Sequence, residues 1–168
     1  MKKLLQHRWG RYLKDIAFVL VMVVAIGAWQ TRTHLSGVEA PAPTLTSLDG
    51  PPVALSSFRG QPVMVAFWAP WCTVCKAETQ NISWVMKLAG NRAHVVSIVT
   101  GFGNVQEVRA FVQERGVDYP VLLGSDDLTR QFRVEAFPTV YFLDGEGRVK
   151  HSVVGYTTTA GLLARLFL

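Results

Sequence analysis

The chain has 168 residues, of which 49% are hydrophobic, and a formal net charge of +5. This length suits one folded domain with appended segments. Residues 1–15 hold five basic side chains and one acidic one, a net charge of +4, whereas residues 16–168 hold 12 basic and 11 acidic side chains. Because the folded part is close to neutral, the charge pattern excludes a nucleic-acid-binding protein with a basic face.

The first 30 residues are typical of an export signal or a membrane anchor. The basic stretch is followed by 14 apolar residues without a charge, Ile16 to Trp29, and this order places the rest of the chain outside the cytoplasm. A membrane span usually needs about 20 residues, and a snorkelling Lys14 can lengthen this one. We expect an uncleaved, single-pass anchor over residues 1–30 in the inner membrane, with the C-terminal domain in the periplasm. The alternative is a signal peptide that is cleaved after residues 38–40. A buried helix of a soluble domain is disfavoured, because the apolar segment is not amphipathic.

Residues 31–43 are polar and then rich in Pro and Ala, which predicts a linker. The domain would then span residues 44–168. Two short segments on either side of Asp49-Gly50 predict a β-hairpin. The apolar runs over residues 62–68 and 94–101 are typical of buried strands.

Helical spacing of apolar residues predicts a helix over residues 73–90 that ends at Gly90. An amphipathic helix over 105–116, an extended piece over 119–125 and a short helix over 126–134 follow. Residues 138–155 predict a second hairpin, with its tip at 144–147. A last helix, over 157–168, has a threonine as its cap. This order predicts an α/β fold in which helices cover both faces of a mixed sheet that has an added N-terminal hairpin.

The chain has only two cysteines, Cys72 and Cys75, and they lie between the first buried strand and the helix. A disulfide across two residues contributes little to stability, since even a loop of ~15 residues gives only about 3 kcal/mol. At the N-terminus of a helix, unpaired N–H groups and the helix dipole favour a thiolate. The position therefore predicts that Cys72 attacks and that Cys75, one turn further in, resolves the mixed disulfide.

Three other interpretations of the cysteine pair compete with redox chemistry. A zinc site is disfavoured because there is no second cysteine pair and the four histidines are scattered, so we expect no metal. Two buried hydrophobic residues are disfavoured because we expect an exposed turn after the strand. A copper(I)-binding or chaperone role stays open, because copper(I) accepts two sulfur ligands, although no Met-rich or Cys/His cluster supports it.

Three segments resemble those of a known family. FWAPWCTVC, residues 67–75, resembles the active site of thioredoxin-fold proteins, and LSSFRGQPVMVAFWAPWC, residues 55–72, resembles the exported TlpA/ResA-like branch. FRVEAFPTVYFLDGEGRV, residues 132–149, is similar to the cis-proline loop and hairpin of that branch. The Cys-x-Val-Cys form with an anchor looks most like the suppressor-of-copper-sensitivity members. The resemblance, over residues 44–168, implies a thioredoxin fold and a protein disulfide oxidoreductase without a bound cofactor.

The resemblance also implies roles for single residues. Pro138 matches the cis-proline, and Phe137 before it would lie beside the sulfurs and pair its backbone with a bound segment. Trp71 would shape the docking surface. Glu78 matches an acidic residue of the ResA-like branch, one helical turn from Cys75, where it would accept the thiol proton. The alternatives are an ordinary loop proline at Pro138 and a solvated helix glutamate at Glu78.

Several positions depart from the family pattern. Thioredoxin has a buried Asp where this chain has Ala66, which leaves Glu78 as the nearest proton acceptor. Gln80 replaces a helix-kinking proline, so the helix is expected to run straighter. Thr139 replaces the glutamate of the cytochrome c maturation subgroup, and Ala69 replaces the threonine of peroxide-reducing relatives.

The direction of electron flow does not follow from the spacer Thr73-Val74, because strong oxidants have a histidine there and typical reductases a proline. Exported TlpA-like proteins are mostly reductants supplied by a membrane electron carrier. We therefore expect a reductant of exported, cysteine-containing proteins, with a membrane electron-donor protein as a second partner. A disulfide-forming oxidant of the same fold is the alternative.

Overall fold

The computed structural model describes residues 15–18, 21–22 and 37–168, and the chain divides into two units, residues 1–33 and residues 34–168. The predicted membrane anchor, residues 1–30, lies almost wholly outside the described residues. Among the residues that are described, no helix is long and apolar enough to cross a membrane.

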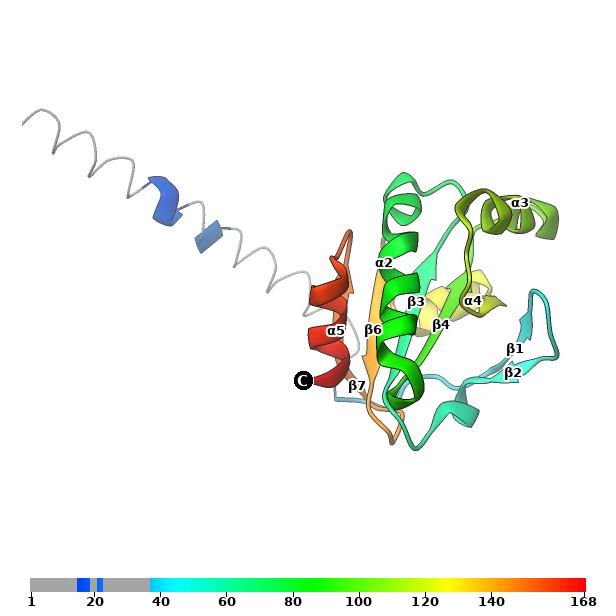
Figure 1. Cartoon of the computed structure of the whole chain (residues 1–168), viewed down its shortest axis with the longest axis horizontal. Coiled ribbons are helices and arrows are strands. Elements are labelled where there is room, and N and C mark those ends of the chain that lie inside the picture. Colours follow the sequence, from blue (N-terminus) through cyan, green and yellow to red (C-terminus); the bar gives the residue numbers. More distant parts are fainter. Residues whose placement is uncertain (1–14, 19–20, 23–36) are drawn as a thin grey trace, which may run out of the picture. The chain divides into compact units, whose positions relative to one another are not determined.

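Residues 37–168 form one mixed sheet of seven strands, shown in Figure 1. The strands are β1 (Thr44–Ser47), β2 (Val53–Ala54), β3 (Val63–Trp68), β4 (His94–Val99), β5 (Val121–Leu123), β6 (Thr139–Leu143) and β7 (Val149–Val154). Their order across the sheet is β2-β1-β5-β4-β3-β6-β7. Strand β4 is parallel to β3 and β5, whereas β6 is antiparallel to β3. The predicted hairpins are β1–β2 and β6–β7.

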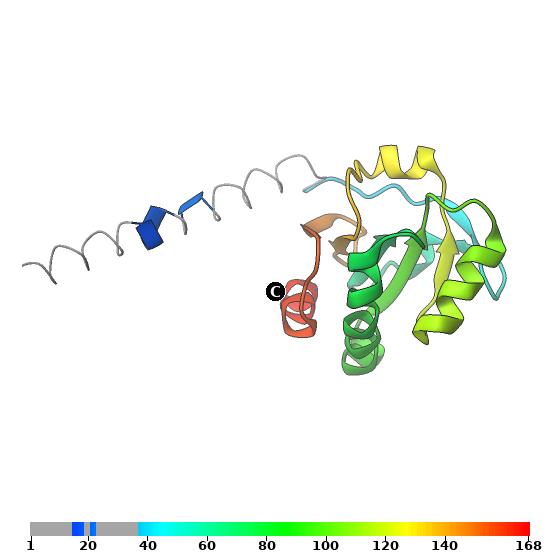
Figure 2. The same ribbon diagram turned by 90° about the horizontal axis from the view of Figure 1, so that it is seen from above.

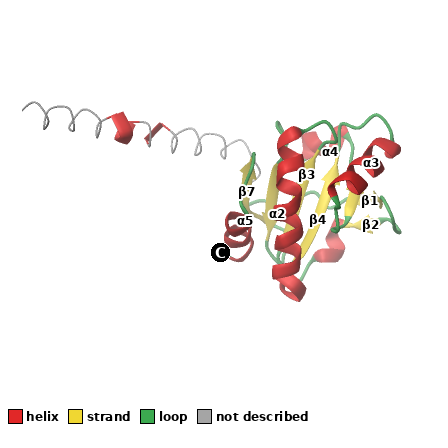
Figure 3. Ribbon diagram, turned by 45° about the horizontal axis from the view of Figure 1, so that its top comes forward, coloured by secondary structure: helices red, strands yellow, loops and turns green. Residues whose placement is uncertain are grey.

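Helices cover both faces of the sheet, as predicted. They are η1 (Leu55–Phe58), α2 (Thr73–Ala89), η2 (Gly90–Arg92), α3 (Val105–Arg115), α4 (Asp126–Gln131) and α5 (Thr159–Phe167). Figures 2 and 3 show α2, α3 and α5 on one face and α4 on the other. Helix α2 runs without interruption through Gln80, and the predicted threonine cap of α5 is Thr158, whose side chain accepts a hydrogen bond from the Gly161 N–H.

Strand β3 is the central element that positions the cysteines. All six of its residues are buried, because alternate side chains enter the cores on the two faces. Met64 and Ala66 pack in the core under α2 and α5, whereas Val65 and Phe67 pack in the core under α4. Trp68 ends the strand, and the chain turns from there into α2.

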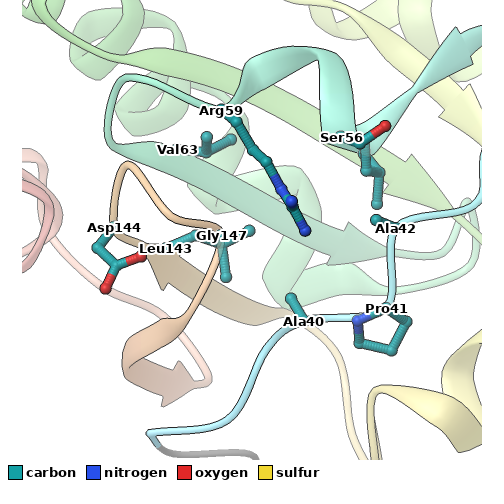
Figure 4. A pocket seen from close by; sticks show the side chains of 10 residues that line it. Ala40, Pro41, Ala42, Ser56, Arg59, Val63, Leu143, Asp144 and Gly147 are labelled. Atoms are coloured by element: carbon teal, nitrogen blue, oxygen red, sulfur yellow. The ribbon is translucent and has the colours of Figure 1, made fainter.

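The chain joins the sheet earlier than its composition predicts. Residues 37–40, which belong to the predicted linker 31–43, run along the start of β7. The Gly37 N–H donates to the Val149 carbonyl (2.8 Å), and the Ala40 N–H donates to the Gly147 carbonyl (2.9 Å). Residues 40–42 then line a small apolar pocket beside Arg59, at the end of the sheet where β3 begins (Figure 4). Cys72 follows the other end of β3.

Candidate functional site

The two cysteines form a disulfide at the N-terminus of α2. Cys72 is the N-cap residue, and its sulfur accepts a hydrogen bond from the Cys75 N–H at 3.1 Å. The Cys72 N–H in turn donates to the Ala69 carbonyl (3.1 Å), which closes the turn between β3 and the helix. When the disulfide opens, the helix dipole and this N–H group stabilise negative charge on the Cys72 sulfur. The geometry is the one that the sequence predicts.

The expectation that this turn is exposed is wrong for the cysteines themselves. Cys72 is 6% exposed and Cys75 is 4% exposed. Both belong to a buried cluster with Trp68, Val99 and Phe111, because α3 and the end of β4 pack over the start of α2. Of the two cysteines, Cys72 has the slightly larger exposed fraction, and it is the one at the helix N-terminus.

Two aromatic residues predicted for the docking surface lie together beside the disulfide. Trp71 is 62% exposed, and its indole N–H donates to the Gly101 carbonyl at 2.9 Å. Its ring meets the Phe137 ring edge-on, with 5.7 Å between the ring centroids. Gly101 has φ +62°, and a Cβ there would lie 3.4 Å from the indole nitrogen. A glycine at position 101 therefore permits both the left-handed backbone of the turn and the close approach of the Trp71 ring.

Pro138 lies on the same side of the molecule as the disulfide. The Phe137–Pro138 peptide bond is cis, as the resemblance implies. Strand β6 begins directly after it, and Thr139 is opposite Phe67 of β3. Pro138 and Cys75 line the same small cavity, so the structure brings these two predicted site residues together.

Glu78 is fully buried, so the alternative of a solvated helix glutamate is wrong. Its Oε1 atom accepts a hydrogen bond from the Thr157 N–H at 2.8 Å, and within the described part of the chain Oε2 makes none. Burial raises the pKa of Glu78 to about 7, and the bond from Thr157 opposes that rise. A carboxyl group with this pKa exchanges a proton readily near neutral pH.

Glu78 lines the same cavity as Cys75. Cys75, Pro138 and Ala66 line this cavity together with Glu78. Ala66 stands where thioredoxin has its buried Asp. The carboxyl group therefore reaches this space from α2 instead of from β3, as the departure at position 66 suggests.

Two further residues, Gly155 and Thr157, contribute hydrogen bonds to the site and were not predicted. The Gly155 N–H donates to the Pro138 carbonyl at 2.8 Å, and the Thr157 N–H binds Glu78. Both act through backbone N–H groups, which every residue type except proline supplies, so the residue types alone do not reveal these contacts. Among the described residues, no group of three or more His, Cys, Asp or Glu side chains could hold a metal ion.

Comparison with known proteins agrees with this geometry. The AhpC/TSA family matches residues 36–152. The thiol-disulfide oxidoreductase ResA of Bacillus subtilis (strain 168) is 29% identical over 149 residues, which cover 83% of each protein. The thioredoxin-like protein YneN of the same organism is 26% identical over 160 residues, which cover 89% of this chain and 94% of YneN.

Solved structures show the same architecture. A thiol:disulfide interchange protein of the thioredoxin family from Chlorobium tepidum TLS superposes with a TM-score of 0.69 at 26% identity, over 77% of this chain and 94% of that one. A secreted Mycobacterium tuberculosis disulfide oxidoreductase homologous to E. coli DsbE gives a TM-score of 0.65 at 26% identity, over 74% and 94%. The predicted resemblance to ResA-like proteins is thus confirmed. The chain belongs to the AhpC/TSA family and is a thiol-disulfide oxidoreductase with a thioredoxin-like fold.

Proposed function

We propose that the protein reduces disulfides in exported, cysteine-containing proteins, with Cys72 as the attacking and Cys75 as the resolving cysteine. The arrangement at the start of α2 carries the proposal: the Cys72 sulfur accepts a helix N-terminal N–H, while Cys75 shares a cavity with the buried carboxyl group of Glu78. The first feature supports a nucleophilic thiolate, and the second supplies a proton acceptor for the second thiol.

The reaction has two steps that transfer two electrons to the client. The Cys72 thiolate attacks one client sulfur, breaks the client disulfide, and forms a mixed disulfide while the other client sulfur leaves as a thiolate and takes up a proton. The Cys75 thiol then gives its proton to the Glu78 carboxylate and attacks the Cys72 sulfur. The second client thiolate leaves, the client is a dithiol, and the protein holds the Cys72–Cys75 disulfide.

The direction of electron flow rests on the resemblance to exported TlpA-like proteins, which are mostly reductants. A proton acceptor beside Cys75 speeds the closure of the protein's own disulfide and, by the reverse path, its opening, so Glu78 supports the exchange chemistry in either direction. Ala69, which replaces the threonine of peroxide-reducing relatives, supports disulfide exchange over peroxide reduction. Trp71, Phe137 and Pro138 border the disulfide and suit an extended client segment that pairs with the backbone before β6.

The proposed location is the outer side of the inner membrane, with residues 1–30 as the anchor. An oxidising compartment does not supply electrons for a reductant, so a membrane electron-donor protein with its own dithiol must reduce the Cys72–Cys75 disulfide after each cycle. An anchor would keep the domain beside that donor at a high effective concentration.

The reduction potential of the full chain, equilibrated with glutathione buffers, tests the direction. A value near that of thioredoxin, about −270 mV, is expected, whereas a value near that of DsbA, about −120 mV, would make the protein an oxidant and overturn the proposal. The Cys72→Ser variant is the control, because it has no intramolecular disulfide to titrate.

A further inference from the structure

We propose that Asn81 is a positioning residue, which holds the backbone of Thr157 so that its N–H group meets Glu78. The inference rests on the proposed function, because it concerns the carboxyl group to which proton exchange with Cys75 is assigned. It adds a residue that lies outside the cysteine motif and outside the cavity.

Asn81 and Glu78 hold the same residue from the same helix. They lie three positions apart on α2, a spacing that places both side chains on one face. The Asn81 Nδ2 atom donates to the Thr157 carbonyl at 2.9 Å, and the Thr157 N–H donates to Glu78 Oε1 at 2.8 Å. Both backbone polar groups of Thr157 are therefore bound to α2, which fixes the direction in which its N–H points.

Thr159 orients the Asn81 amide. The Thr159 hydroxyl donates to Asn81 Oδ1 at 3.1 Å, which leaves Nδ2 directed at the Thr157 carbonyl. Thr159 is the first residue of α5, and the helix cap is Thr158. The contact between Thr159 and Asn81 is therefore separate from the capping of α5.

The segment that contains Thr157, residues 155–157, also forms a hydrogen bond with the cis-proline. The Gly155 N–H donates to the Pro138 carbonyl at 2.8 Å, two residues before Thr157. Residues 155–157 thus connect Pro138 to Glu78, and Asn81 fixes the Glu78 end of the connection. Without Asn81 the segment keeps its bond to Pro138, while Thr157 loses the bond that aims its N–H at the carboxylate.

The effect of Asn81 is measurable on Glu78 itself. The titratable groups next to Glu78 are Cys75 on its own helix and Tyr119 in the segment before β5. In the disulfide form Cys75 does not titrate. Burial raises the pKa of Tyr119, so the phenol stays neutral near pH 7. In the part of the chain that the structure describes, Glu78 therefore titrates without another ionising neighbour in the oxidised protein.

The test is a carbon-13 NMR titration of the Glu78 carboxyl group in the oxidised full chain, with the resonance assigned by its loss in Glu78→Gln. In Asn81→Ala we expect the titration midpoint to rise by about one pH unit, because a hydrogen bond that stabilises the carboxylate is lost. If Asn81 served only to hold α5 to α2, its loss would let water in and lower the midpoint, or leave it unchanged. Either result overturns the inference.

Two further variants separate positioning from stability. Thr159→Val should raise the midpoint in the same direction by a smaller amount, and it carries the test if Asn81→Ala does not fold. Ser125→Ala removes the cap of α4, where the Ser125 hydroxyl accepts from the Leu128 N–H, and should lower stability without moving the midpoint. The titration needs no client protein. If Asn81→Ala raises the titration midpoint of Glu78 but the wild-type protein fails to reduce clients, only the proposed function is refuted. An unchanged midpoint in an active protein would refute only the role of Asn81.

Discussion

At the scale of single residues, the proposed role of Glu78 as a proton acceptor for Cys75 depends on how its carboxyl group is buried. A carboxylate taken out of water is unfavourable unless hydrogen bonds replace the lost hydration. Glu78 receives one such bond, from Thr157, and none to Oε2 from the described residues. This partial compensation explains why its pKa stays at about 7 instead of falling to that of a well-solvated acid.

The Glu78→Gln variant should slow the resolution of a mixed disulfide. The glutamine side chain fits the same space but accepts no proton, so we expect the resolution rate to fall by at least about tenfold near pH 8. In the wild type this rate should rise as pH increases through about 7, where the Glu78 carboxylate forms. Stopped-flow measurement from pH 5.5 to 9 checks both points. A variant with an unchanged rate and pH profile would remove Glu78 from the mechanism.

The same residue predicts how stability depends on pH. Its folded pKa, about 7, exceeds the ordinary value of 4.5, so between these values the folded state holds a proton that the unfolded state has released. The native protein should therefore lose stability as pH rises through this window, by at most about 3 kcal/mol. Above pH 7, Glu78→Gln should be the more stable protein.

Urea unfolding of the wild type and Glu78→Gln at pH 5 and pH 8 measures this dependence. Glu114→Gln is the matched control, because Glu114 is exposed and forms its ion pair with Arg115 at the surface. An equal stability difference between wild type and Glu78→Gln at both pH values would show that the carboxyl group is not desolvated.

At the scale of elements, close packing behind β4 constrains the segment that leads from β5 into α4. A Cβ atom at Gly124 would lie 2.6 Å from Ile98 Cγ2 and 2.7 Å from Thr100 Cγ2. Ile98 belongs to β4, and Thr100 directly follows that strand. These neighbours are buried and branched, so they have little room to move.

Gly124→Ala should therefore destabilise the protein by about 1–3 kcal/mol, the usual range for overpacking. Gly50→Ala is the control, because the nearest atom to a Cβ there is 3.5 Å away, in ordinary contact. The midpoints of denaturant unfolding give the comparison. Equal midpoints for the two variants would mean that β4 and the segment after β5 are less tightly packed than the structure shows.

The order of the elements could be predicted from the sequence because the apolar patterns are strong. The buried run at residues 62–68 became β3, and the helical spacing that ends at Gly90 became α2. The pairing of residues 37–40 with β7 was not predicted. Those residues join the sheet through backbone hydrogen bonds, and the Pro/Ala-rich composition around them is typical of a linker.

At the scale of the whole molecule, the fold brings together three segments that are far apart in the sequence. The turn before α2 and the start of that helix contribute Trp71, the cysteines and Glu78, the segment before β6 contributes Phe137 and Pro138, and the segment before α5 contributes Thr157. The cysteines and Glu78 could be predicted because one helix carries them, and Pro138 because its segment resembles a family landmark. The burial of the cysteines and the contacts of Thr157 depend on α3 and α5, whose packing the local sequence does not specify.

The central claim is that Cys72 is an activated nucleophile because of its place at the start of α2. Alkylation of the reduced Cys75→Ser protein across pH tests it most directly, since Cys72 is then the only thiol. We predict half-maximal reactivity below about pH 7.5, as for thiols at helix N-termini. Half-maximal reactivity at the ordinary value of about 8.5 or above would contradict the account.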